Sequence, residues 1–185
     1  DEHNRFPATS SHAFKHGYLE RPVVDEWLHI LGQVIQRTWP QIVLKQHSFS
    51  VKVSHDVDQP TLYAFKSWGM IVRMMAGHLI KRRDLKAFVT APYVKLATHH
   101  KLISADPFNT FDWLMDVSEA NNVKSAFYFI CGRSDATHDA DYDPGHPIIR
   151  NLMRRIHQRG HEIGLHPSYN TYQNPQSIEQ EAGRL

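Results

Sequence analysis

Two aspartates, Asp56 and Asp58, stand one residue apart at the end of a short, partly apolar stretch. If that stretch is a strand, the alternation of side chains places both carboxylates on the same side of the sheet. Two negative charges so close together are costly unless a cation or a proton lies between them, so the pair favours a metal site. Aspartates are also common in turns, and the alternative is a pair that caps the loop before Pro60.

His166 follows a second short stretch, residues 160–165. A neutral imidazole is a common zinc ligand, and carboxylates together with imidazole form a usual mixed ligand set. The chain contains 14 histidines, so one loop histidine carries little weight by itself. His166 gains weight because we expect it at the same end of a parallel sheet as Asp58.

The apolar pattern predicts the strands that would carry these side chains. Phe49, Val51 and Val53 alternate with polar residues, which is typical of a strand. The run 126–130 is short and almost continuously apolar, as expected of a parallel strand covered on both faces, and 161–165 is predicted as a third strand. Polar side chains that follow such strands gather at one edge of the sheet.

Helices are predicted around and between the strands from apolar residues recurring at intervals of three and four. The basic residues 81–83 are expected to end the second helix, and Pro92 is expected to interrupt the third. Strands that alternate with helices indicate an α/β fold, in which helical crossovers connect parallel strands. The predicted helices lie between 22 and 39, between 61 and 83, in part of 85–100, within 107–122, between 147 and 160, and after 175.

The composition excludes several classes of protein. Of 185 residues, 41% are hydrophobic and 22% are charged, as in a packed globular domain. The formal net charge of +2 is too small to indicate a nucleic-acid-binding protein. No apolar run is long enough to span a membrane. The single cysteine, Cys131, cannot form an intrachain disulfide, so we expect a cytoplasmic protein. The missing initiator methionine and the helical pattern at the last residues predict a fragment of a longer chain.

The stretch 54–58 resembles the first motif of the metal-dependent polysaccharide deacetylases, the NodB-homology carbohydrate esterases. In that family the leading aspartate is the catalytic base and the second aspartate binds the metal. The resemblance therefore implies that Asp56 is the base and that Asp58 is a ligand of Zn²⁺ or of another divalent cation.

The stretch 159–166 resembles the strand that enters the second motif of the same family. There a His-x-x-x-His pair completes the metal site, and His166 matches the first of the two histidines. The apolar strand between the motifs and the segment 142–145 also fit the layout of the family. The resemblance covers about residues 49–185.

Two departures from the family pattern stand out. Asn170, not histidine, lies four residues after His166, so the third ligand is its amide oxygen, another side chain or water. His161 is a possible substitute but ranks below Asn170. In the family, this position usually supports the metal site without binding the metal, and a strand would direct the His161 side chain away from a ligand in the following loop. The later motifs, which supply a histidine general acid, have no counterpart before Leu185. Three strands cannot close a barrel, so we expect a truncated part of a distorted (β/α) barrel.

The resemblance implies an enzyme that hydrolyses the carbon–nitrogen bond of acetylated sugars, or removes O-acetyl groups, in surface polysaccharide metabolism. Its partner is an acetylated saccharide. The alternatives are a metal-free amidohydrolase on the same scaffold and a non-catalytic carbohydrate-binding relative. The expected organisation is an irregular lead-in with an N-terminal helix over 1–47, followed by a partial deacetylase domain over 48–185.

Overall fold

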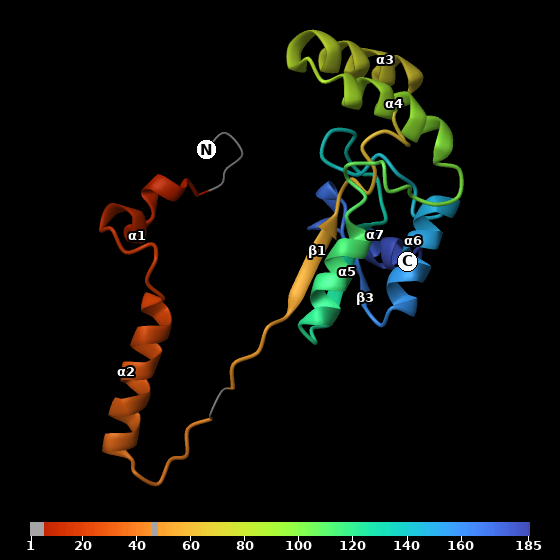
Figure 1. The fold of residues 1–185 in the computed structure, drawn as a ribbon. Coiled ribbons are helices and arrows are strands. Elements are labelled where there is room, and N and C mark those ends of the chain that lie inside the picture. The colour runs from red at the N-terminus through yellow and green to blue at the C-terminus, as the bar shows by residue number, and fades with distance from the viewer. Residues whose placement is uncertain (1–5, 46–47) are drawn as a thin grey trace. The chain divides into compact units, whose positions relative to one another are not determined.

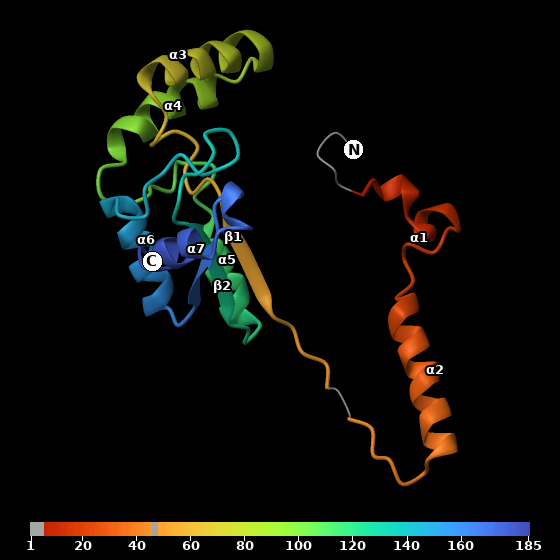
Figure 2. The same ribbon diagram turned by 180° about the vertical axis from the view of Figure 1, so that it is seen from behind.

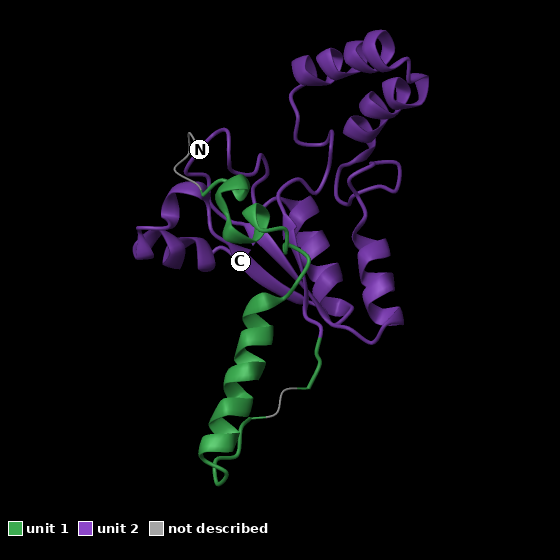
Figure 3. Cartoon of the chain, turned by 90° about the vertical axis from the view of Figure 1, so that its left-hand side faces the viewer, with its two compact units in different colours: residues 1–50 green, residues 51–185 purple. Residues whose placement is uncertain are grey.

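The computed structural model describes residues 6–45 and 48–185 and divides into two compact units, residues 1–50 and 51–185 (Figure 3). Among these residues, no helix combines the length and the apolar character needed to cross a membrane. The elements of the first unit are η1 (Ala8–Ser10), α1 (His12–Lys15) and α2 (Val23–Thr38). Those of the second are β1 (Val53–Val57), α3 (Trp68–Gly77), η2 (His78–Arg82), α4 (Leu85–Ala97), α5 (Phe111–Ala120), β2 (Ser125–Ile130), α6 (Pro147–Gln158), β3 (Glu162–His166), η3 (Tyr169–Thr171) and α7 (Pro175–Ala182).

The first unit consists mainly of α2, the amphipathic helix expected after Pro22. Its first turn carries Asp25 and Glu26, whose negative charges suit the positive end of the helix dipole. Arg21 forms an ion pair of 2.6 Å with Glu26 across this end. The apolar side chains Trp27 and Leu28 are exposed within the unit.

The second unit is a mixed α/β arrangement around an open, three-stranded parallel sheet with the order β1-β2-β3 (Figures 1 and 2). In register, Asp56 lies beside Tyr128 and Tyr128 beside Gly164. The predicted strand at residues 49–53 begins later than expected, at Val53. Val53 pairs with Ser125, the first residue of β2, so residues 49–52 have no ladder partner on β2.

One face of the sheet carries the main hydrophobic core. Phe127 and Phe129 are fully buried on this face, beside Val57 of β1. Helix α5 packs on them through Phe111 and Met115. Helix α6 contributes the apolar residues Ile148, Ile149, Leu152, Met153 and Ile156. Both helices therefore cover the same face of the sheet, and the register alternation sends the side chains of Asp56, Tyr128 and Gly164 to the other face.

Helices α3 and α4 form a hairpin on the side of the sheet toward which β1 points (Figures 1 and 2). The hairpin has its own small core, in which Ile71, Ala91 and Val94 are fully buried. One local prediction was wrong here, because Pro92 lies inside α4 and does not interrupt it. The basic residues 81–83 do end the preceding helical segment, whose last residues, 78–82, form the π-helical turn η2.

Candidate active site

The open face of the sheet carries polar side chains near the carboxyl ends of its strands. Asp56 of β1, Tyr128 of β2 and Gly164 of β3 form one row across it. The Asp56 side chain is 62% exposed and that of His166, the last residue of β3, is 37% exposed. These groups are therefore accessible to a dissolved ligand while the strands hold their spacing.

Asp56 and His166 meet across the sheet, although β2 lies between their strands. The distance from Asp56 Oδ2 to His166 Nε2 is 3.9 Å. His166 Nδ1 lies 3.0 Å from the carbonyl oxygen of Pro167, so Nδ1 carries the hydrogen and donates it. Nε2 is then the ring nitrogen on the side of Asp56. A histidine anchored in this way through its other nitrogen is the usual form of a metal ligand.

Asp58 lies just beyond β1, in an exposed bend at the start of the loop that leads to α3. It lies near Tyr142, whose buried hydroxyl joins the ends of two strands. Tyr142 donates to the carbonyl oxygen of Val57 at 2.7 Å and accepts from the backbone N–H of Ile130 at 2.9 Å. Burial raises the pKa of Tyr142, and the negative charge of Asp58 contributes to the increase. The tyrosine therefore stays protonated and holds the strand ends beside Asp58.

Asn170 is held by the loop that follows β2. Its backbone N–H donates to Ser134 Oγ at 2.8 Å, and its side-chain amide donates to the carbonyl oxygen of Ser134 at 3.1 Å. The amide oxygen is therefore the only side-chain atom of Asn170 suited to bind a cation. His161 lies at the other end of β3, where its Nδ1 accepts from Ser125 N–H at 3.1 Å. It therefore belongs to the amino ends of the strands, away from Asp56.

Two aspartates of the loop after β2, Asp135 and Asp139, accept hydrogen bonds from backbone N–H groups. Asp139 accepts hydrogen bonds from the N–H groups of Asp135 at 2.7 Å and of Tyr169 at 2.6 Å. Partial burial opposes the ionisation of Asp139, but these hydrogen bonds outweigh it and lower its pKa. Asp135 likewise accepts from Thr137 and His138. Asp139 thus connects the loop after β2 with the loop after β3, through the N–H group of Tyr169.

Tyr128 lies flat over Gly164 on the open face. A Cβ atom added at Gly164 would lie 2.5 Å from Cε1 and 2.6 Å from Cδ1 of the Tyr128 ring. Only a residue without a side chain lets the ring occupy this position. The Tyr128 ring over Gly164 forms an aromatic floor on the same face of the sheet as Asp56.

We expect Gly164→Ala to destabilise the unit by about 1 to 3 kcal/mol, because the added methyl group must displace the ring of Tyr128. Urea unfolding followed by circular dichroism measures the loss. The matched control is the same substitution in a Tyr128→Ala background, where most of the additional loss should disappear. Equal losses in both backgrounds would show that the ring and Gly164 do not interact.

The comparisons with known proteins concern mainly the first unit. Residues 1–40 match a family of unknown function (DUF7033). No curated protein matches the chain. No solved structure matches it either. The match lies outside residues 49–185, which include the open face and its polar groups.

The donor atoms on this face suit a divalent cation. Carboxylate and imidazole groups are both common ligands of zinc. In the ranges 6–45 and 48–185, no three His, Cys, Asp or Glu side chains already converge on one point. Asp56 and His166 do approach each other, and the exposed Asp58 follows two residues after Asp56 in a bend. The carboxylate and imidazole donors therefore fit a divalent cation by their chemistry.

Two tyrosines near the site were missed by the sequence analysis. Tyr128 belongs to an apolar run that was interpreted as covered on both faces, and its partial exposure shows that one face is open. In the sequence, Tyr142 stands out only as part of the loop segment 142–145. Its contact with Val57 spans 85 residues, and no periodic pattern could indicate it.

Proposed function

We propose that residues 51–185 carry the base and the metal ligands of a hydrolase that removes acetyl groups from an N- or O-acetylated sugar. The observation that carries the proposal is the approach of Asp56 Oδ2 to His166 Nε2 at 3.9 Å on an open sheet face. We also propose that the three parallel strands are part of a distorted (β/α) barrel, whose polar interior would be this face.

In this proposal Asp58 and His166 hold the cation, with the amide oxygen of Asn170 as the third protein ligand. The bound cation supplies Lewis acidity to an acetyl carbonyl group and lowers the pKa of a water molecule. Asp56 accepts the proton of the attacking water at its exposed carboxylate. Pro167 fixes the His166 ring through Nδ1, so Nε2 keeps its lone pair directed at the site.

The aromatic floor supports a saccharide substrate. The C–H face of a sugar ring is apolar and packs well on an aromatic side chain. Tyr128 offers such a surface in the same row as Asp56, and Gly164 keeps the surface flat. The acetylated sugar would thus lie on the tyrosine with its acetyl group near the carboxylate.

Zinc binding tests the proposal. We expect the purified chain to bind one Zn²⁺, measured by competition with a fluorescent chelator, and we expect His166→Ala and Asp58→Ala to lose most of this binding. The control is His157→Ala, which removes an exposed histidine from α6. A wild-type chain without a zinc site, or a His166→Ala variant that binds as tightly as wild type, would contradict the metal site.

A metal-free amidohydrolase is the second candidate, and the Asp56–His166 contact favours it as well. A carboxylate beside an anchored imidazole can take a proton from water without any metal. The two candidates differ in one measurement, the release of acetate from acetylated oligosaccharides after treatment with a strong chelator. Loss of release and its recovery with Zn²⁺ support the metal site, whereas undiminished release supports the metal-free enzyme.

A further inference from the structure

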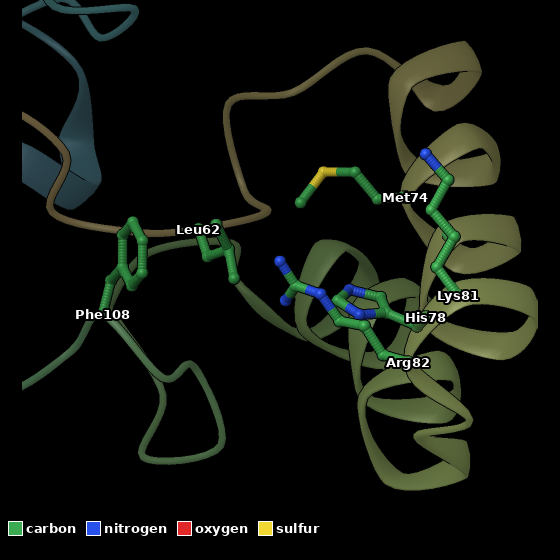
Figure 4. A pocket seen from close by; sticks show the side chains of 7 residues that line it. Leu62, Met74, His78, Lys81, Arg82 and Phe108 are labelled. Carbon is green, nitrogen blue, oxygen red and sulfur yellow. The ribbon is translucent and has the colours of Figure 1, made fainter.

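A second candidate site lies at the π-helical turn η2 (Figure 4). A pocket of about 480 Å³ opens there between the α3–α4 hairpin and the loops on either side of it. This volume is within the range of small-molecule sites, about 300 to 1,000 Å³. The residues that line the pocket are Leu62, Met74, Gly77, His78, Lys81, Arg82 and Phe108.

The pocket combines apolar walls with positive charge. Leu62, Met74 and Phe108 are apolar, while Lys81 and Arg82 come from the last residues of η2. Figure 4 shows the guanidinium group of Arg82 extending toward Leu62. In the part of the chain that the structure describes, neither cation forms an ion pair with an acidic side chain. A guanidinium group at an apolar wall is a ready partner for an oxyanion.

The apolar wall is fixed before any ligand binds. Asp106 is 2% exposed and accepts hydrogen bonds from the backbone N–H groups of Leu62 at 3.1 Å and Phe108 at 2.9 Å. One buried carboxylate thus positions two lining residues. On the opposite side, the hydroxyl of Tyr63 lies 3.2 Å from His78 Nε2. A preformed wall binds a ligand with less loss of conformational entropy.

The backbone beside the pocket adopts two uncommon conformations. Residues 78–82 form a π-helical turn, and Arg83, which ends it, has a left-handed φ of 52°. Both conformations are less stable than a continued α-helix, and both occur preferentially at functional sites. Here the turn brings His78, Lys81 and Arg82 to one pocket.

We propose that this pocket binds a small organic anion, in which an oxyanion head group is joined to an apolar chain. Arg82 binds the head group, with Lys81 adding positive charge at the rim. The apolar chain packs on Leu62, Met74 and Phe108. The proposal does not depend on the Asp56–His166 site, because no residue belongs to both.

Isothermal titration calorimetry with octyl phosphate, below its micellar concentration, tests the proposal. Inorganic phosphate carries the head group alone, and octyl glucoside carries the same chain without charge. We expect one molecule of octyl phosphate to bind per chain. We expect the affinity of each partial probe to be lower by a factor of about ten or more. Equal binding of octyl glucoside would overturn the role of charge, and no binding of octyl phosphate would overturn the site.

Two variants locate the binding. Arg82→Gln removes the charge, and Gly77→Leu fills the pocket, since a Cβ atom at Gly77 meets no atom within 4 Å. We expect each to weaken octyl phosphate binding about tenfold or more. The controls on the same helix are Arg73→Gln and Gly69→Leu, which change charge and size outside the pocket lining and should bind as wild type. Pocket variants that bind as wild type, or controls that weaken binding equally, would refute the assignment.

Discussion

Replacing Asp56 by asparagine is expected to lower the rate of ester hydrolysis by about two to four orders of magnitude, the usual contribution of a positioned general base. Asparagine keeps the size of the side chain and the exposed position on β1 but cannot accept the proton. The suitable probe is 4-nitrophenyl acetate, because its leaving group departs without a general acid. Release of 4-nitrophenolate, followed by absorbance, reports the base and the metal site alone.

The matched control is Glu162→Gln. Glu162 lies on the same open face at the start of β3, and its side chain is also 62% exposed. We expect this variant to hydrolyse the ester at the wild-type rate. The zinc content of Asp56→Asn shows whether Asp56 is a base or a metal ligand. Loss of a base leaves the bound zinc in place, whereas loss of a ligand lowers the zinc content. An unchanged rate in Asp56→Asn would remove Asp56 from the mechanism.

The second large effect is expected at Asp106, where alanine should lower the free energy of unfolding by about 3 to 5 kcal/mol. Asp106 also accepts a hydrogen bond from the hydroxyl of Thr61. Its removal leaves that hydroxyl and the N–H groups of Leu62 and Phe108 without their acceptor in a buried place. Urea unfolding measures the loss, and Asp106→Asn, which keeps one acceptor oxygen, should lose less.

Asp112→Ala is the control for this prediction. Asp112 is likewise a carboxylate, which forms an ion pair with Arg155 at 3.2 Å, but its side chain is 55% exposed. Exposed ion pairs contribute little to the free energy of unfolding, so removal of the Asp112 carboxylate should change the stability only slightly. Similar losses at both positions would mean that burial of the Asp106 network does not determine its contribution.

The order of the elements could be predicted from the sequence, because it depends on local periodicity. Helix α6 begins at Pro147 as expected, and β2 differs from the prediction by a single residue. The start of β1 could not be predicted, since alternation extends to Phe49 but the neighbouring strand does not. Pro92 costs about 3 kcal/mol inside a helix. The burial of Ala91 and Val94 on the α3–α4 interface offsets that cost, and no local pattern shows it.

The candidate site was predicted only in part, for a related reason. The positions of Asp56 and His166 follow from strand ends, which periodicity indicates. The role of Tyr142 beside this site depends on a contact across 85 residues, and that of Asp106 at the second pocket on a contact across 44 residues. Such contacts are decided by packing, and a single sequence carries no signal for them. The π-helical turn is equally hidden, because residues 78–82 have the composition of an ordinary helix end.

The Tyr142 hydroxyl joins the last carbonyl group of β1 to the last amide of β2, and so couples a surface loop to the sheet. If the loop swings away, the amide of Ile130 loses its acceptor at the same moment. That amide should therefore exchange its hydrogen with solvent at the frequency of loop opening, faster than amides in the middle of β2. Local opening of the loop would then break hydrogen bonds at the edge of the sheet next to Asp58 while the core stays folded.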